Sequence, residues 1–274
     1  AANSCNLHCP NCLIKETMQQ PLDFQKIQEV LIREKPDKVH FGGGEPLLDE
    51  TNLEILFGII IHFHNIKFSV TTNLCYPMSY LRLDFLNSID ELWTSFDIGR
   101  FNTFGDILRW MDNVIILKRH YKRIGLITCI SPEFLNKDQR KYKKFIDWMG
   151  FDQYKFVPMI NQSGLDKEKI LRFIDDITMI RDPKNKTLDM IANNKFTSCY
   201  YHHLYRSDDW KVFNGLGEEI DLKFSNNEKC PHIAEDCLLC NNLPECGGRC
   251  PQIECVFFDE LRNKLIKDIK KRKR

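Results

Sequence analysis

The feature that most constrains the fold is an alternation of short apolar segments with amphipathic ones along residues 23–181. The apolar segments have the length and the β-branched or aromatic content of buried parallel strands. We predict strands at residues 38–41, 67–70, 91–94, 124–128 and 154–157. Their carboxyl ends, 24 to 32 residues apart, are expected near Phe41, Asn73, Asp97, Cys129 and Pro158. This spacing predicts β–α repeats, a parallel sheet or barrel, and a functional site at the carboxyl ends of the strands.

The segments between these strands have the periodicity of helices. Apolar residues recur at helical spacing after Asp23, which is a suitable N-cap, and again between Ile107 and Leu117. A further helix is predicted at residues 166–181. A sixth strand is expected before Cys5, where the sequence holds only residues 1–4. The predicted fold class is therefore α/β, a partial (β/α)6 TIM-like barrel with a truncated first strand.

The composition is that of an ordinary globular protein, with 43% hydrophobic residues, 28% charged residues and a formal net charge of +1. This charge balance gives no reason to expect nucleic-acid binding. No apolar run approaches the roughly 20 residues of a membrane span, and the start of the chain does not have the pattern of a signal peptide.

The twelve cysteines are distributed very unevenly. Three fall within the first twelve residues, seven lie between Cys199 and Cys255, and Cys75 and Cys129 lie in the long segment between. Disulfide frameworks occur mostly in much shorter secreted chains, whereas closely spaced thiols typically bind metal. We therefore predict metal ligation and a cytoplasmic location, where thiols stay reduced.

The first cysteine group, Cys5, Cys9 and Cys12, has the spacing C-x3-C-x2-C. Three thiolates leave one iron of a 4Fe–4S cluster without a protein ligand, and an open iron is able to chelate a small molecule. Zinc, or an electron-transfer cluster with its fourth ligand elsewhere, is the alternative that this spacing alone leaves open.

Three motifs stand at predicted strand ends: FGGGEP at residues 41–46, TTN at 71–73 and SFD at 95–97. Taken with the cysteine spacing, they resemble the GGEP, TxN and SxD segments of the radical S-adenosylmethionine (SAM) superfamily. In that family the GGEP segment binds the amino group of SAM. The resemblance implies a SAM site formed by Gly43, Gly44, Glu45, Thr72, Asn73, Ser95, Arg100 and Pro158. Glu45 is expected to fix the orientation of its loop.

The resemblance also implies a mechanism. An open iron binds SAM, one electron from the cluster cleaves the sulfonium, and the resulting 5′-deoxyadenosyl radical abstracts hydrogen from a C–H bond. Asp97 is expected to orient substrate or to hold its loop. Cys75 is a candidate donor of a hydrogen atom or proton, with packing beside the SAM loop as the alternative. Arg100 is expected to reach the carboxylate or ribose of SAM, or else to be an exposed loop residue.

Two positions depart from the family pattern. Asn11 stands where many relatives have an aromatic residue against the adenine, and Leu74 stands where a glycine often follows the TxN segment. We expect these departures to affect the subfamily and leave the class unchanged.

The second cysteine group begins with the spacing C-x2-C-x5-C-x3-C from Cys237, which suits zinc or iron–sulfur. Beside a radical SAM core it resembles the SPASM domain of peptide- and protein-modifying enzymes, which carries two auxiliary 4Fe–4S clusters. The resemblance implies one auxiliary cluster on Cys237, Cys240, Cys246 and Cys255. The other would use Cys199, Cys230 and Cys250.

Only three cysteines remain for that last cluster, where SPASM domains often supply four. We expect an open iron there, or ligation by His202, His203 or a substrate thiolate. The predicted domains are a barrel at 1–181, a linker at 182–195 and the auxiliary-cluster domain, with a basic C-terminal helix, at 196–274.

The resemblance favours a maturase that forms a thioether or carbon–carbon cross-link, or a related oxidation, in a ribosomally made peptide. Sulfatase maturation is a weaker hypothesis, because Pro231 stands where those enzymes have Asp. A radical SAM dehydrogenase acting on a small molecule is another hypothesis, and a zinc-stabilised binding module is a non-enzymatic one. The expected partners are a precursor peptide, a separate leader-peptide recognition protein, since no such module precedes the predicted barrel, and a reductant such as flavodoxin or ferredoxin. Nucleic acid and membrane are not expected.

Overall fold

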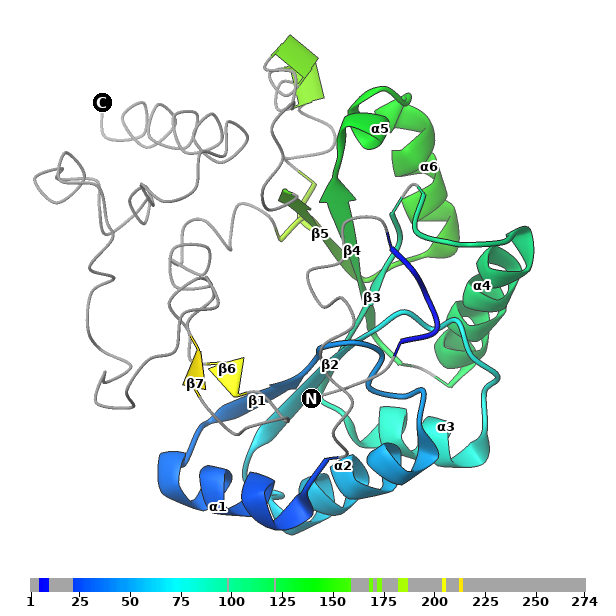
Figure 1. Ribbon diagram of the computed structural model, residues 1–274. Coiled ribbons are helices and arrows are strands. Elements are labelled where there is room, and N and C mark those ends of the chain that lie inside the picture. The colour runs from blue at the N-terminus through cyan, green and yellow to red at the C-terminus, as the bar shows by residue number, and fades with distance from the viewer. Residues whose placement is uncertain are drawn as a thin grey trace, which may run out of the picture. The chain divides into compact units, whose positions relative to one another are not determined.

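A computed structural model describes most of the first 158 residues and short segments of the remainder (Figure 1). The described residues are 5–9, 22–97, 99–120, 122–158, 168–169, 172–173, 182–186, 204–205 and 212–213. The chain divides into two compact units. Unit 1 comprises Ala1–Thr128, Met149–Asp152 and Tyr205–Trp210, and unit 2 comprises Cys129–Trp148, Gln153–Leu204 and Lys211–Arg274.

Strands and helices alternate along the described chain, as the sequence predicts. The strands are β1 (Lys38–Phe41), β2 (Lys67–Thr72), β3 (Glu91–Ser95), β4 (Ile124–Ile130), β5 (Gln153–Pro158), β6 (Leu204–Tyr205) and β7 (Val212–Phe213). The helices are α1 (Phe24–Glu34), α2 (Glu50–His62), α3 (Tyr80–Ser88), α4 (Phe104–Arg119), α5 (Pro132–Leu135) and α6 (Gln139–Met149).

Strands β1 to β5 form a parallel sheet whose spatial order is the chain order. The register pairs Val39 with Phe68 and Val70 with Leu92, and it sets Thr94 against Leu126. Strands β6 and β7 form a separate two-stranded sheet. In unit 1, helices α1 to α4 lie along one side of strands β1 to β3 (Figure 1). The predicted β–α repeat is confirmed. The strands are parallel, and their carboxyl ends therefore lie at one edge of the sheet.

Each helix of unit 1 begins at a residue whose side chain caps it. Asp23 is the N-cap of α1, as predicted, and accepts a hydrogen bond from the backbone of Lys26. Helices α2 and α3 begin after Asp49 and Ser79 in the same way. Helix α4 begins with a capping box between Thr103 and Asp106. Such a cap contributes typically about 1 kcal/mol, because it satisfies a backbone donor that the helix leaves unpaired.

The core of unit 1 lies between the sheet and its helices. Leu53 and Ile59 of α2, and Trp110, Val114 and Leu117 of α4, are completely buried. The indole of Trp110 also donates a hydrogen bond of 2.9 Å to the buried hydroxyl of Thr94 in β3. Burial of such side chains, at about 1.5–3 kcal/mol each, holds the helices on the sheet.

One glycine in this core has no room for a side chain. A Cβ on Gly125 of β4 would lie 2.4 Å from the ring of Trp93, which stands opposite it in β3. Trp93 is itself fixed by a hydrogen bond of 2.7 Å from its indole to Glu91. The residue at 125 therefore sets how closely β4 approaches the Trp93 ring.

Unit 2 has an aromatic core of its own. The rings of Phe134, Phe156 and Phe173 have centroids 5.0 to 5.7 Å apart. Residues 182–186, which the sequence assigns to a linker, bridge β5 in parallel fashion through Tyr154 and Asn185. Lys143 of α6 forms an ion pair of 2.8 Å with Asp182. In the helix predicted at 166–181, the described residues 168–169 and 172–173 are helical.

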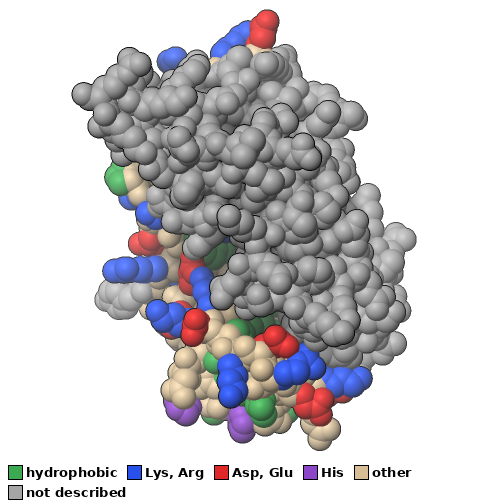
Figure 2. Space-filling model, turned by 90° about the vertical axis from the view of Figure 1, so that its left-hand side faces the viewer, with side chains coloured by type: hydrophobic (Ala, Val, Ile, Leu, Met, Phe, Trp, Pro, Cys, Tyr) green, Lys and Arg blue, Asp and Glu red, His purple; other side chains and the backbone are tan. Residues whose placement is uncertain are grey.

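The described surface carries charges of both signs. On the face shown in Figure 2, lysine and arginine side chains are interspersed with aspartate and glutamate. Among the helices described above, none combines the length and apolar character required to cross a bilayer.

Candidate functional site

Four segments of unit 1 carry most of the predicted site residues, and Thr72, Ser95 and Pro158 lie in the strands. We call the four segments the cysteine loop (5–9), the β1 loop (42–49), the β2 loop (73–79) and the β3 loop (96–103). The last three follow strands that end at the same edge of the sheet, since those strands are parallel. Ligand sites in parallel α/β sheets form at such edges. Side chains tie these segments together as follows.

Glu45 fixes the β1 loop to the end of β2. Its carboxylate accepts hydrogen bonds from the hydroxyl of Thr72 (2.6 Å), the backbone N–H of Asn73 (2.5 Å) and the backbone N–H of Leu47 (3.2 Å). Glu45 is buried. Burial raises the pKa of this carboxyl to about 7, although its three hydrogen bonds act in the opposite direction. The side chain thus holds the loop, which is the role that the sequence predicts for it.

The polar chain continues into the core of unit 1. The Thr72 hydroxyl donates its only hydrogen bond to Glu45. It therefore accepts hydrogen bonds from the Tyr76 hydroxyl (2.8 Å) and from the backbone N–H of Leu74 (3.2 Å). Burial raises the pKa of Tyr76 well above its ordinary value, so that Tyr76 remains a hydrogen-bond donor.

Asn73 connects this cluster to the cysteine loop. Its side-chain amide donates to the side-chain oxygen of Asn6 (2.8 Å) and to the sulfur of Cys5 (3.6 Å). The backbone N–H of Leu7 also donates to the Cys5 sulfur at 3.5 Å. Burial raises the pKa of Cys5, while the Leu7 and Asn73 contacts lower it. Two N–H groups therefore face the sulfur of a predicted iron ligand.

Leu74 has a left-handed backbone conformation, with φ of 52°. It is completely buried, and its carbonyl accepts a hydrogen bond of 2.9 Å from the side chain of Asn113 in α4. The same amide donates to the carbonyl of Tyr76 at 2.7 Å. This is the position at which a glycine often follows the TxN segment in the resembled family. The backbone geometry that favours glycine is present here, and leucine adopts it because Asn113 and the surrounding core hold it.

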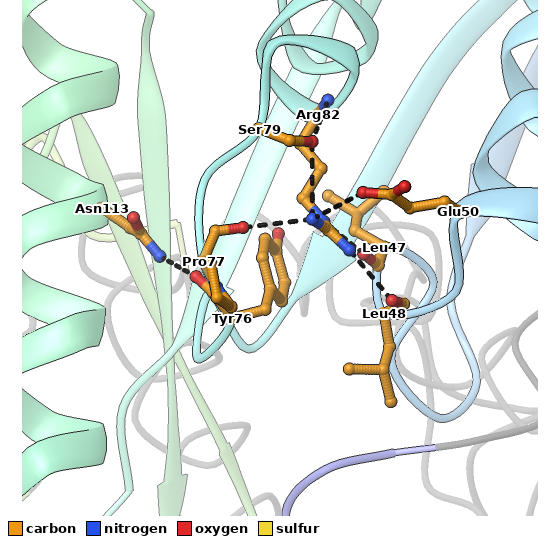
Figure 3. A network of polar contacts seen from close by, with 8 residues as sticks. All are labelled: Leu47, Leu48, Glu50, Tyr76, Pro77, Ser79, Arg82 and Asn113. Carbon is orange, nitrogen blue, oxygen red and sulfur yellow. Dashed lines mark hydrogen bonds and ion pairs between the residues drawn. The ribbon is translucent and has the colours of Figure 1, made fainter.

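A second buried charge connects the β1 and β2 loops (Figure 3). The guanidinium of Arg82 in α3 donates to the carbonyls of Leu47 (2.8 Å), Leu48 (3.0 Å) and Pro77 (3.2 Å) and forms an ion pair of 3.2 Å with Glu50. The Arg82 guanidinium also lies 5.1 Å from the centroid of the Tyr76 ring. Arg82 therefore fixes both loops from the helix side of the sheet.

Arg100 lies in the β3 loop and forms an ion pair of 3.0 Å with Asp97. Burial acts to lower the pKa of Arg100, but the charges of Asp97 and Cys9 outweigh it, so that the pKa is raised. Its Nε–H is buried and has no hydrogen-bond partner among the described residues. A buried guanidinium donor without a partner is costly, and a ligand that carries a hydrogen-bond acceptor would satisfy it.

The candidate catalytic residue Cys75 is buried. Its thiol donates to the carbonyl of Asn73 at 3.3 Å and is 3.8 Å from the carbonyl of Asp106. Burial raises the pKa of Cys75 to about 12, so that the group is a thiol at neutral pH. Burial and the contact with the Asn73 carbonyl are compatible with the packing alternative, and the thiol form is also the one that a hydrogen-atom donor requires.

The other predicted SAM residues lie at strand ends. Gly43 has φ of 119°, a backbone conformation open to glycine, and Gly44 follows it in the β1 loop. Ser95 is buried at the end of β3. Pro158 ends β5, in unit 2.

Cys5, Cys9, Cys75 and Cys129 carry thiols rather than disulfides. Within the described residues no group of three potential metal ligands is found. The other predicted ligands lie outside the described residues, and these are Cys12, Cys199, Cys230, Cys237, Cys240, Cys246, Cys250 and Cys255. The candidate ligands His202 and His203 lie outside them as well, as does Asn11.

Sequence reasoning missed four residues of this network: Asn6, Tyr76, Arg82 and Asn113. Asn6 had a signal, because it stands between two predicted iron ligands and is polar in a loop that must be ordered. Tyr76, Arg82 and Asn113 had no such signal. A buried polar side chain cannot be distinguished from a solvated one in the sequence, because its partners are not known.

Comparison with known proteins gives one kind of match. Neither a protein-family model nor a curated relative matches this sequence. Among solved structures, the crystal structure of SuiB from Streptococcus suis is similar, with a TM-score of 0.51 and 15% sequence identity over 72% of this chain. The match covers 53% of SuiB, so the chain spans about half the length of that protein. A similarity of this kind shows the fold.

Proposed function

We propose that this chain is a radical SAM enzyme that modifies a ribosomally made peptide. The observation that carries the proposal is the hydrogen-bonded cluster joining Cys5 to Asn73 and Asn73 to Glu45. These residues belong to three motifs that are far apart in the sequence and that share one use in the resembled family, the binding of SAM at an open iron.

The residues present fit SAM and its cluster. Cys5 and Cys9, together with Cys12, would hold the iron–sulfur cluster through three thiolates. The buried Nε–H of Arg100 needs a hydrogen-bond acceptor, and the carboxylate of SAM is such a group. A bound SAM would supply a 5′-deoxyadenosyl radical able to abstract hydrogen from a C–H bond.

The protein's own contribution is to position groups. Glu45 keeps the β1 loop closed on β2, so that the backbone of Gly43 and Gly44 is available to the amino group of SAM. Asp97 holds the Arg100 guanidinium in place. Leu7 and Leu74, both buried, anchor the cysteine loop and the β2 loop in the core.

The peptide substrate rests on the C-terminal cysteines, and the fold that the chain shares with SuiB is compatible with it. The seven cysteines between Cys199 and Cys255 have the spacing of a SPASM domain, which occurs mainly in enzymes with peptide or protein substrates. A peptide is therefore the substrate class we propose, with a thioether or carbon–carbon cross-link, or a related oxidation, as the product.

Anaerobic reconstitution with iron and sulfide tests the cofactor. We expect a brown protein whose reduced cluster gives an EPR signal that changes on addition of SAM. Replacing Arg100 with glutamine should weaken SAM binding by about 10- to 100-fold, because a hydrogen bond to a charged group is lost. The control Arg109→Gln, on the exposed side of α4, should leave binding unchanged. A colourless protein that takes up zinc, or unaltered binding by the Arg100 variant, would contradict the proposal.

Co-expression tests the substrate class. A short peptide encoded beside the gene would be produced with the enzyme and its mass measured. A mass decrease that matches loss of hydrogen in a cross-link, dependent on Cys5, supports the proposal. An unmodified peptide together with oxidation of a small alcohol by the same enzyme would favour the dehydrogenase hypothesis.

A further inference from the structure

We propose that Asn6 is a positioning residue that orients Cys5 for cluster binding and tunes the reduction potential of the cluster. This inference rests on the proposed function and adds a residue to it. It derives from hydrogen bonds that converge on the β2 loop.

The β2 loop is a rigid platform. Within the described structure, the carbonyls of residues 74–77 each accept a hydrogen bond from a side chain of another segment. The donors are Asn113 to Leu74 (2.9 Å), Asn6 to Cys75 (2.6 Å), Asn113 to Tyr76 (2.7 Å) and Arg82 to Pro77 (3.2 Å). A loop whose consecutive carbonyls are all bound by side chains of neighbouring segments has little freedom to move.

Asn6 fastens the cysteine loop to this platform by both ends of its amide. Its nitrogen donates to the Cys75 carbonyl (2.6 Å), and its oxygen accepts from the Asn73 amide (2.8 Å). The next residue, Leu7, is 5% exposed and anchors the loop in the core. The two hydrogen bonds of Asn6 and the buried side chain of Leu7 thus fix the loop between the predicted ligands Cys5 and Cys9.

The link from Asn6 to Cys5 passes through Asn73. The Asn73 amide nitrogen donates to Asn6 and lies 3.6 Å from the Cys5 sulfur. Its oxygen accepts from the backbone N–H of Cys75 at 2.8 Å, so both ends of this amide are held as well. Asn6 therefore determines where the Asn73 N–H points relative to the sulfur.

An N–H group directed at a ligand sulfur affects an iron–sulfur cluster in two ways. It stabilises negative charge on the sulfur and so raises the reduction potential. It also orients the ligand, and loss of such an outer contact typically lowers metal affinity by 10- to 100-fold. A residue that only supported the fold would change neither property of a protein that remained folded.

The experiment compares the reconstituted wild-type protein with Asn6→Ala and Asn6→Asp. The reduction potential is measured by following the EPR signal that responds to SAM, which the proposed function assigns to the cluster on Cys5, Cys9 and Cys12. Cluster loss to a chelator is timed in the same samples. Circular dichroism checks the fold. Asn65→Ala, which removes an exposed asparagine outside the network, is the control.

We expect both Asn6 variants to shift the potential to more negative values. Asn6→Asp should shift it further, since it loses the donor to Cys75 and adds a negative charge near Cys5. Cluster loss should be about tenfold faster in both, and unchanged in Asn65→Ala. If Asn6→Ala does not fold, the rate of cluster loss from Asn6→Asp decides the result, because the added charge shifts the potential by itself.

Unchanged potential and unchanged cluster loss in folded Asn6 variants would overturn the inference and leave the proposed function standing. A wild-type protein without a SAM-responsive cluster would overturn the proposed function, and the inference with it. A shifted potential in Asn65→Ala as well would show a general effect on the protein and would also overturn the role of Asn6.

Discussion

Two buried ionisable side chains, Glu45 and Arg82, connect the same pair of loops in opposite ways. Glu45 is an acceptor and collects donors from Leu47, Thr72 and Asn73. Arg82 is a donor, and its guanidinium bonds backbone carbonyls and the Glu50 carboxylate (Figure 3). The contacts of Glu45 lead through Asn73 to Cys5, whereas those of Arg82 end within the loops that it joins.

This difference distinguishes Arg82, which only supports the fold, from Glu45, which is also connected to the proposed cofactor site. Both groups are nearly solvent-free, with 2% and 7% exposure. Burial alone therefore says little about function, and the partners of each group decide it. Arg82 should matter for the stability of unit 1, and Glu45 for stability and for cofactor binding together. The following predictions test this division, beginning with the largest effect.

Replacing Arg82 with methionine should lower the free energy of unfolding by about 3–5 kcal/mol. The methionine fills similar space but leaves the carbonyls of Leu47, Leu48 and Pro77 and the Glu50 carboxylate without their donor. Urea unfolding measures the effect. Arg33→Met, at a side chain that is 55% exposed, should cost less than about 0.5 kcal/mol. Equal effects at the two positions would show that the Arg82 network contributes little.

The unfolding free energy should depend on pH through Glu45. Its pKa is about 7 in the folded protein and ordinarily 4.5, so between these values the folded state keeps a proton that the unfolded state releases. Its contribution is fully present below about pH 4.5 and is lost as pH rises through 7. The size is up to about 3 kcal/mol.

Urea unfolding of wild type and Glu45→Gln across pH 5 to 8 measures this contribution. The wild-type advantage over the variant should shrink as pH rises, because glutamine does not titrate. A difference that stays constant, or grows with pH, would show that the Glu45 carboxylate is ionised throughout and that its three donors outweigh burial.

Replacing Leu74 with glycine should lower stability by about 2 kcal/mol. Relief of the left-handed backbone contributes about 1–2 kcal/mol in the favourable direction. Loss of a completely buried leucine costs about 2–5 kcal/mol and outweighs it. Thermal unfolding monitored by circular dichroism gives the sign. A more stable glycine variant would mean that the core around Leu74 contributes less than its backbone strain.

Replacing Cys75 with alanine should have the smallest effect. The hydrogen bond from the thiol to the Asn73 carbonyl is lost, at a cost of about 1 kcal/mol. Cleavage of SAM and modification of substrate should stay within about fivefold of wild type, even if the whole 1 kcal/mol were lost in the transition state. Normal SAM cleavage combined with abolished substrate turnover would instead make Cys75 the hydrogen donor.

The sequence predicted the strands of the sheet closely, because five apolar runs of strand length recur at one spacing. It also predicted the capping role of Asp23, which short-range chemistry determines. The polar network could not be foreseen in the same way. Asn6, Arg82 and Asn113 act through partners 32 to 69 residues away, and no local pattern identifies such pairs.

Leu74 shows how a departure from a family pattern acquires a physical meaning. In the sequence it is an apolar residue where glycine is common. In the structure it keeps the left-handed backbone that glycine favours, with Asn113 bound to its carbonyl. The predicted ligands from Cys199 onward lie outside the described residues, so the auxiliary clusters stay predictions.

The most direct test of the central claim is the amount of 5′-deoxyadenosine formed from SAM and a strong reductant by the anaerobically reconstituted protein. The account predicts steady formation by the wild type. The variant with Cys5, Cys9 and Cys12 all replaced by alanine, its C-terminal cysteines intact, should form none. Absence of 5′-deoxyadenosine from the wild type with its cluster loaded, or equal amounts from the two proteins, would contradict the assignment of a radical SAM site to these three cysteines.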